Sequence, residues 1–126
     1  MKKITASVLT LLLIFLLCLY SVNRVDRICR ETSNLLRQAE TQCILGNYEG
    51  AKEIIRLSQA HWEKHEAFLG IALRHTESDD IEILYPPLLE SCSKENAGDF
   101  LLRNLELIAT LKQLSHMEKA FLFNIL

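Results

Sequence analysis

The sequence has little of the two residues that most often turn or interrupt a chain, with four Gly and two Pro among 126 residues. It also contains no convincing run of alternating apolar and polar residues, which is the pattern of a strand buried on one face. Together these shortages exclude a fold built from many short strands and turns. Apolar residues instead recur at spacings of three and four, so we expect an all-α protein.

Several motifs for catalysis and cofactor binding are missing as well. No glycine lies next to a Lys-Ser or Lys-Thr pair, which excludes a phosphate-binding loop, and no serine stands in a nucleophile elbow. The four cysteines include no Cys-x-x-Cys pair. We therefore expect no enzymatic activity and no cofactor.

The cysteines are expected to be buried free thiols. Cys29 and Cys43 would lie on one helix about 21 Å apart, which is too far for a bond between them. A disulfide from Cys92 to Cys29 or to Cys43 is the alternative if the domain lies in an oxidising compartment.

Charged residues are absent from Ile4 to Val22, where the chain reads ITASVLTLLLIFLLCLYSV. A helix over these 19 residues would be roughly 28 Å long, close to the thickness of the bilayer hydrocarbon core. We predict an uncleaved membrane anchor over residues 1–23, which contacts the lipid bilayer through residues 4–22. A separate domain over residues 24–126 should follow it.

Two other targeting segments are alternatives to the anchor. A cleaved signal peptide would also begin with Lys2 and Lys3, but its apolar region would be shorter, and a small residue would stand at the position of Leu19. A lipoprotein would use Cys18, but Leu17 occupies the preceding position, where a small residue is expected. The anchor therefore fits the segment better than either alternative.

The charges beside the anchor bear on its orientation. Lys2, Lys3 and the terminal amine precede it, and three arginines diluted by acids follow it, so the positive-inside rule gives only a slight preference. Because the tail before the anchor is so short, we expect it to stay in the cytoplasm. The prediction is a single-pass protein of the cell membrane with an extracytoplasmic C-terminal domain.

Residues 24–126 carry more acid than base, with 12 Lys and Arg against 16 Asp and Glu. Such a domain does not offer the basic face that a phosphate backbone needs, which argues against a nucleic-acid partner. The expected partners are the bilayer and a protein, which would be either another chain or a second copy of this one.

The domain should form a three- to four-helix antiparallel bundle. Its first helix is expected to continue straight out of the membrane and to end at Gly46-Asn47, because glycine readily adopts the left-handed conformation that ends helices. A second helix should follow, with one stripe through Ala51, Ile55, Ser58, Trp62, His65, Leu69 and Ala72. A stripe this wide packs into a bundle rather than into a two-stranded coil.

Other local signals divide the rest of the domain. A third helix should begin between Thr76 and Ser78, where TESDD offers an N-cap and acids that suit the positive end of a helix. The pair Pro86-Pro87 should kink or break that helix. The segment SKENAGD is expected to be a turn, and a capping box of Ser115 and Glu118 would restart the last helix.

The stretch GNYEGA carries the Gly-x-Tyr-x-x-Ala pattern of tetratricopeptide repeats, in which the glycine relieves a turn and the other two residues pack between helices. No second copy follows 34 residues later, and a solenoid needs about three repeats. We interpret Gly46, Tyr48 and Ala51 as a local structural motif that forms a tight helical hairpin.

The stretch HWEKHEAFLGIALRHTESDD is rich in histidines and acids. On a helix, His61 and His65 would share a face and could chelate a divalent metal ion such as zinc. Further ligands would come from the third histidine and the acids behind it, namely His75, Glu77 and Asp79. The zinc-protease pattern His-Glu-x-x-His fails, because a tryptophan follows the first histidine. We favour a structural interpretation, in which the histidines pack beside the core and the acids begin a helix.

Three features recur together in one known family: Trp62 in the second helix, the run from His75 to Ile81, and the ending LKQLSHMEKAFLFNIL. In these features the chain resembles a family of small bacterial proteins, typical of spore-forming Gram-positive Clostridia, that is classed as a domain of unknown function. The resemblance covers nearly the whole chain and implies a membrane segment followed by a helical domain. It also implies a more continuous third helix than Pro86-Pro87 allows. It implies no activity.

Two functions from different classes agree with these observations. The first is a membrane-anchored scaffold or protein-interaction module without enzymatic activity, supported by the anchor, the helical periodicity and the apolar ending AFLFNIL. The second is a metal-binding or metal-sensing ectodomain that uses His61, His65 and nearby acids. A C-terminus docked and buried on the bundle, together with histidines that hold no metal, favours the first function, and an exposed apolar patch there would favour docking on a partner. Convergent histidine and carboxylate side chains favour the second.

Overall fold

A computed structural model describes residues 1–73 and 75–125, and the side chains at 75, 76 and 125 lie outside the described part. All regular structure in the described residues is helical, so the all-α prediction is confirmed. The helices are α1 (Lys2–Ile44), α2 (Tyr48–Lys64), α3 (Glu66–Ala72), α4 (His75–Glu82), α5 (Tyr85–Ser93) and α6 (Ala97–Ile125).

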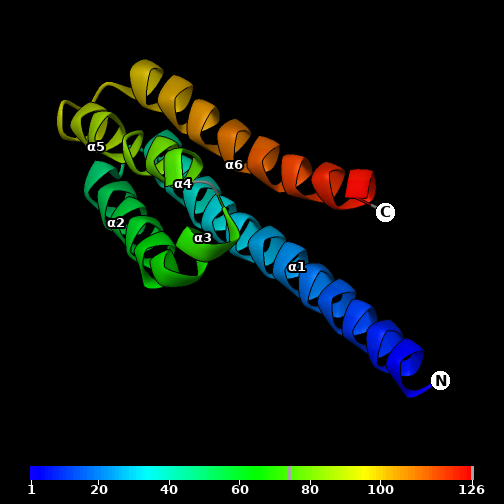
Figure 1. The fold of residues 1–126 in the computed structure, drawn as a ribbon. Helices are drawn as coiled ribbons and strands as arrows, with labels where there is room; N and C mark the ends of the chain where they lie inside the picture. Colours follow the sequence, from blue (N-terminus) through cyan, green and yellow to red (C-terminus); the bar gives the residue numbers. More distant parts are fainter. Residues whose placement is uncertain (74, 126) are drawn as a thin grey trace.

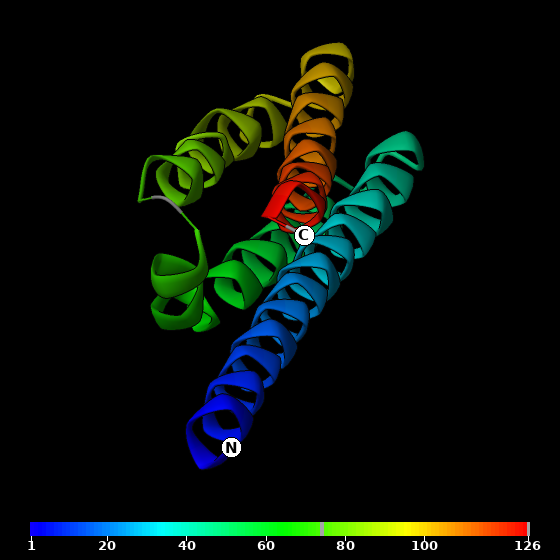
Figure 2. The ribbon, with the colours of Figure 1, turned by 45° about the vertical axis from the view of Figure 1, so that its right-hand side comes forward.

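The longest helix, α1, has 43 residues and changes its surroundings along its length. Up to residue 17 its side chains are almost all exposed, whereas from Val25 onward one stripe is buried in the bundle. In Figure 1 and Figure 2 its N-terminal part extends beyond every other element. Among the described residues, α1 is the one helix long and apolar enough to cross a membrane, a test that a signal sequence also meets.

The bundle consists of the C-terminal half of α1 together with α2, α5 and α6, while the short helices α3 and α4 connect α2 to α5 (Figure 1). Its largest fully buried side chains include Trp62 of α2, Tyr85 of α5 and Phe100 of α6. Removal of these side chains from water is the main favourable contribution to folding. The expected antiparallel helical bundle is therefore confirmed.

Two side-chain contacts set the antiparallel register of α1 and α6. The amide Nδ2 of Asn104 donates to the backbone carbonyl of Leu36 at 3.0 Å. The hydroxyl of Ser115 donates to Oδ1 of Asp26 at 2.5 Å. The C-terminal end of α6 therefore points toward the exposed, apolar end of α1, as Figure 2 also shows.

The chain turns after α1 and after α5 with the same local geometry. Gly46 has a φ of 82° and Glu95 a φ of 53°, both in the left-handed region that ends helices. In each case the next residue caps the following helix, because Oδ1 of Asn47 and of Asn96 accepts the backbone N–H three residues later, at 3.0 and 3.1 Å. The predicted end of the first helix at Gly46-Asn47 is confirmed.

Two helix boundaries near the histidines differ from the predictions. The apolar stripe predicts one helix up to Ala72, but α2 ends at Lys64 and α3 begins at Glu66. The N–H of His65 bonds the carbonyl of Trp62 at 3.1 Å, a tighter turn than an α-helix makes. In addition, α4 begins at residue 75, slightly earlier than expected. No Gly or Pro marks the break at His65, so local signals do not reveal it.

The break predicted at Pro86-Pro87 is present in the structure, whereas the helix restart predicted at Ser115 is not. Pro86 and Pro87 lie in the first turn of α5, so the expected break before them is confirmed. The capping box of Ser115 and Glu118 is wrong, because α6 runs without interruption from Ala97 to Ile125. Ser115 lies inside this helix, and its hydroxyl bonds α1 rather than the backbone of a new helix start.

Candidate functional site

The two histidines of the predicted metal site lie together at the end of α2. Their ring centroids are 5.0 Å apart, and the ring planes meet at 75°. Nε2 of His61 lies 2.9 Å from Oε2 of Glu31 on α1, which is close enough for an ion pair. The angles between the two groups do not meet those of a hydrogen bond. Sequence reasoning missed Glu31, because only the packing of α2 on α1 brings it to the histidines.

The surroundings of these histidines are those of a packed helix junction. Burial lowers the pKa of His65, and the neighbouring His61 lowers this pKa further, so the neutral imidazole is favoured. The adjacent Trp62 is fully buried. The guanidinium of Arg24 lies 4.0 Å from the centroid of the Phe68 ring and connects α1 to α3.

The acids of the predicted metal site lie on α4, away from this pair in the chain. Glu77 is half-buried, whereas Asp79 is exposed. The pKa of Glu118 on α6 is raised mainly by burial and, to a lesser extent, by the negative charge of Glu77. The side chain of His75 lies outside the described part. Among the described residues, no group of three or more His, Cys, Asp or Glu side chains is placed to hold a metal ion. The structure therefore brings His61 and His65 together, and the side chains it describes do not form a larger ligand set around them.

The residues of the predicted structural motif lie along the α1–α2 hairpin. Gly46 occupies the turn, and Ala51 and Trp62 are fully buried on α2. Tyr48 is half-buried, and its backbone carbonyl accepts a hydrogen bond from the thiol of Cys92 at 3.1 Å. The motif thus lies where α2 meets α1 and α5.

All four cysteines are free, and three of them are buried in the bundle. Burial raises the pKa of Cys29 to about 12, with smaller contributions from Asp26 and Glu118. Burial likewise raises the pKa of Cys43 and of Cys92. Because the thiolate is the nucleophile, these three thiols are poor reagents at neutral pH.

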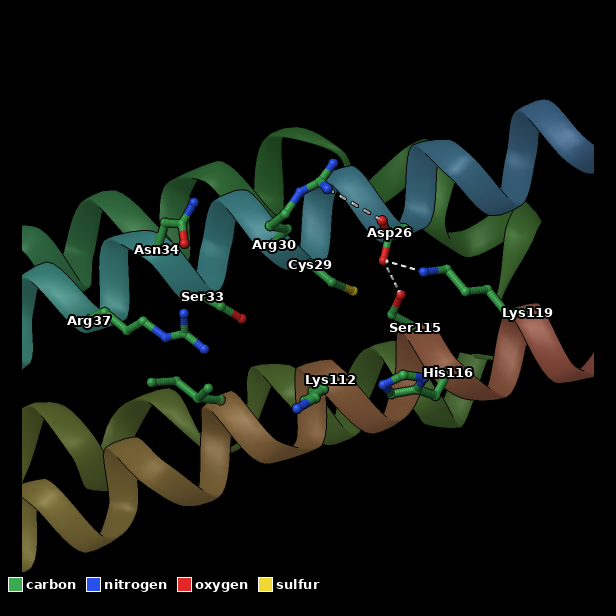
Figure 3. Close-up of a pocket in the computed structure, with 11 residues that line it drawn as sticks. Asp26, Cys29, Arg30, Ser33, Asn34, Arg37, Lys112, Ser115, His116 and Lys119 are labelled. Atoms are coloured by element: carbon green, nitrogen blue, oxygen red, sulfur yellow. Dashed lines mark hydrogen bonds and ion pairs between the residues drawn. The ribbon is translucent and has the colours of Figure 1, made fainter.

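A groove of about 280 Å³ lies between α1 and α6. Arg30 and Arg37 of α1 line it from one side, and Lys112 and Lys119 of α6 line it from the other (Figure 3). Its buried polar lining residues are Cys29, Ser33 and Ser115. These four cations share the groove with one carboxylate, Asp26, in a protein whose formal net charge is −2.

The carboxylate of Asp26 neutralises part of this charge. Besides the bond from Ser115, Oδ1 lies 3.1 Å from Nζ of Lys119, and Oδ2 lies 3.8 Å from a guanidinium nitrogen of Arg30. The Ser115 hydrogen bond is the largest cause that lowers the pKa of Asp26, so this group is charged at neutral pH. Arg37 and Lys112 lie farther from Asp26 (Figure 3), and within the described part of the chain neither is paired with a carboxylate.

A second surface follows α6, which is apolar on two sides. One side is buried in the bundle through Phe100, Leu107, Leu111, Leu114 and Leu122. The other side, here called the outer face of α6, consists of Leu102, Leu105, Ala109, Ala120 and Phe123. Helical spacing places these five residues along one line, which the exposed polar residues Lys112, Gln113 and His116 interrupt between Ala109 and Ala120. Leu102, Leu105 and Phe123 are 67%, 64% and 74% exposed, so the bundle leaves this face uncovered.

Sequence reasoning did not identify the groove, although the chain contains a local signal for it. Arg30 and Arg37 are seven residues apart, as are Lys112 and Lys119, and seven residues are about two helical turns. Each pair therefore forms a row on one side of its helix. The net charge of residues 24–126 is negative, so it gives no sign that cations gather in these two rows.

No curated protein and no solved structure matches the chain. One family does match, over residues 19–125, which cover the end of the apolar segment and the whole bundle. Its description is "Domain of unknown function (DUF4363)", which assigns no activity. Because this match covers far more than half of the chain, the protein belongs to the DUF4363 family of domains of unknown function.

Proposed function

We propose that the protein is a single-pass membrane protein whose extracytoplasmic bundle holds a protein partner, without enzymatic activity of its own. The observation that carries this proposal is the outer face of α6, an apolar surface that the bundle leaves uncovered. Exposed apolar side chains that line up on one face of a helix are typical of a surface that contacts a partner, so this face favours a second contact.

The anchor is supported by the N-terminal part of α1. Its exposed side chains are almost all apolar, and burial of such side chains is favourable by roughly 25 cal/mol for each Å² removed from water. A helix also satisfies its own backbone hydrogen bonds, which is what a bilayer requires. We therefore assign residues 4–22 to the membrane, where α1 contacts lipid rather than protein.

The register of α1 and α6 indicates where the partner lies. Ser115 is level with Asp26, which follows the anchor closely. Phe123 lies eight residues beyond Ser115, or about 12 Å, and because α6 is antiparallel to α1 it is level with about Cys18, inside the proposed anchor. A partner that covers the outer face of α6 would thus reach the level of the bilayer. We expect it to be another membrane protein or a second copy of this chain.

The orientation follows from the residues before the anchor. The tail with Lys2 and Lys3 is short and positively charged, so it is retained in the cytoplasm more readily than it is translocated. The bundle would then lie outside. The absence of an activity is proposed because His61 and His65 pack against each other and against Glu31, in the manner of structural residues.

Membrane insertion is tested by washing membranes at alkaline pH and measuring how much full-length protein stays in the pellet. The Leu12→Arg/Leu16→Arg variant should be released, because a central arginine costs about 2.5–3.5 kcal/mol for insertion. The control variant Leu102→Arg/Leu105→Arg, with the same charge change on α6, should stay in the pellet. Protease added outside intact cells should digest the bundle. Release of the unchanged protein would contradict the anchor, and protection of the bundle would contradict its orientation.

The partner is tested by placing a photo-crosslinking phenylalanine analogue at Leu105 in cells. We expect an adduct from this position and none from Glu53, an exposed polar position on α2. Leu102→Asp should remove the adduct, because it puts a charge into the contact. An adduct of the mass of two chains would identify self-association, and another defined mass would identify a different partner. Equal adducts from both positions, or none from Leu105, would contradict the proposed function.

A further inference from the structure

We infer that the groove between α1 and α6 is a binding site for a phosphate group. This site lies beside the outer face of α6, but it does not depend on a protein partner. The inference rests on the two rows of cations that α1 and α6 place on opposite sides of the groove, Arg30 with Arg37 and Lys112 with Lys119 (Figure 3).

The spacing of the rows fits an anion of more than one charge. Each row spans seven residues, or about 10 Å, and the contacts of Ser115 with Asp26 and of Asn104 with Leu36 place Lys112 nearly level with Arg30, so the two rows meet end to end along the groove. Like charges held this close repel one another unless an anion lies between them. Arginine binds phosphate with two parallel hydrogen bonds, and lysine contributes a point charge, so the groove offers both kinds of contact.

The charge in the groove is only partly neutralised by the protein itself. Asp26 pairs with Lys119 and lies near Arg30, whereas Arg37 and Lys112 have no carboxylate partner among the described residues. The phosphate is therefore expected to lie first between Arg37 and Lys112. The hydroxyl of Ser33, which lines the same groove, is a further donor.

Two sources could supply the phosphate, a soluble phosphate ester or the headgroup of a lipid. Asp26 lies four residues beyond Val22 and Lys112 is level with a position about seven residues beyond it, or roughly 6 and 10 Å, so the end of the groove with Lys112 and Lys119 would be near the depth of lipid headgroups. The lipid source rests on the proposed membrane anchor, whereas binding of a soluble phosphate does not.

The first test measures pyrophosphate binding by calorimetry, with the full-length protein in nanodiscs of neutral lipid at low salt. We expect saturable binding that Arg37→Gln/Lys112→Gln weakens by about tenfold. The control Arg56→Gln/Lys64→Gln removes the same charge from exposed positions on α2 and should change the affinity by less than about twofold. Circular dichroism shows whether each variant is folded.

Asp26→Asn provides a test in the opposite direction. The asparagine keeps an oxygen that accepts the Ser115 hydrogen bond, but it no longer neutralises Lys119 and Arg30. We expect this variant to bind pyrophosphate about threefold more tightly or better. Equal weakening by the groove variant and the α2 control would overturn the inference, because it would mean that only the total charge matters. Absence of binding to the unchanged protein would overturn it as well.

The source is identified by repeating the titration in nanodiscs that contain phosphatidylglycerol, with oleate-containing discs of the same charge as the control. Weaker pyrophosphate binding with phosphatidylglycerol than with oleate would support the inference and assign the site to lipid headgroups. Equal affinity in both discs would support it with a soluble ligand. A failed alkaline-wash test would remove the anchor and the lipid source, but binding of pyrophosphate would still be expected.

Discussion

The hydroxyl of Ser58 on α2 lies 2.8 Å from the phenol oxygen of Tyr85 on α5, and both groups are buried in the core. The same hydroxyl donates to the backbone carbonyl of Thr32 on α1 at 3.3 Å. Two hydrogen bonds of one hydroxyl thus connect three helices inside a largely apolar core. A buried hydrogen bond of this kind contributes about 1 kcal/mol to stability.

We predict that Tyr85→Phe lowers the free energy of unfolding by about 1 kcal/mol, because Ser58 loses one of its two partners. The measurement is urea unfolding of the full-length protein in detergent. Tyr48→Phe is the control, since the described residues offer its phenol no hydrogen bond. Combined with Ser58→Ala in a double-mutant cycle, Tyr85→Phe should show a coupling of about 1 kcal/mol. Additive effects of the two substitutions would mean that the contact between Ser58 and Tyr85 contributes nothing to the free energy of unfolding.

The left-handed residues Gly46 and Glu95, in the turns before α2 and α6, predict substitutions that change stability in opposite directions. A β-carbon at Gly46 would meet no atom within 4 Å, so Gly46→Ala tests the backbone conformation alone. We expect it to destabilise the protein by about 1 kcal/mol, and Glu95→Gly to stabilise it by a similar amount. Gly98→Ala, in the first turn of α6, is the control and should stabilise slightly. The changes are read from urea midpoints, and a loss of stability in Glu95→Gly would contradict the prediction.

The pH dependence of stability should include a contribution from His65. Burial and His61 lower the pKa of His65 below 6.5 in the folded protein. The unfolded chain therefore binds the proton more readily, so stability is present above pH 6.5 and is lost as the pH falls through the folded pKa. We expect NMR titration of the His65 ring to give this lowered pKa.

A matched variant separates the two causes of this shift. His61→Gln should raise the pKa of His65 only part of the way to its ordinary value, because burial is the larger cause. His65→Gln should remove this contribution to the loss of stability in acid. A His65 ring that titrates at the ordinary histidine pKa in the unchanged protein would show that the junction is open to water.

The elements that sequence predicted well are those decided by local chemistry. Gly46-Asn47 ends α1 because glycine tolerates the left-handed conformation, and Pro86-Pro87 begins α5 because proline suits a first helical turn. The break at His65 has no such local cause. Contacts between helices, including Arg24 on Phe68, are the kind of interaction that decides it, and they are visible only in the folded chain.

The candidate sites show the same limit. His61 and His65 could be placed on one face by their spacing, but their partner Glu31 comes from another helix. The cationic groove needs a correct register between α1 and α6, because a shift by half a turn would turn one row of cations away from the other. That register depends on contacts such as the one from Asn104 to Leu36, which no short sequence pattern encodes.

The contact that sets this register leads to the last prediction. Nδ2 of Asn104 donates to the carbonyl of Leu36 at 3.0 Å, whereas its buried Oδ1 has no partner among the described residues. Asn104→Leu loses the bond but also removes the unpaired oxygen, so we expect a change of about 1 kcal/mol or less. Asn104→Asp should cost about 3 kcal/mol at pH 7, because it buries a charge next to a carbonyl oxygen. Urea unfolding at pH 7 and pH 4 tests this, since a protonated carboxylic acid at this position can donate again, and the Asn104→Asp variant should regain stability in acid. Equal losses for both substitutions at pH 7 would show that the hydrogen bond, rather than burial of an unpaired group, determines the stability at this position.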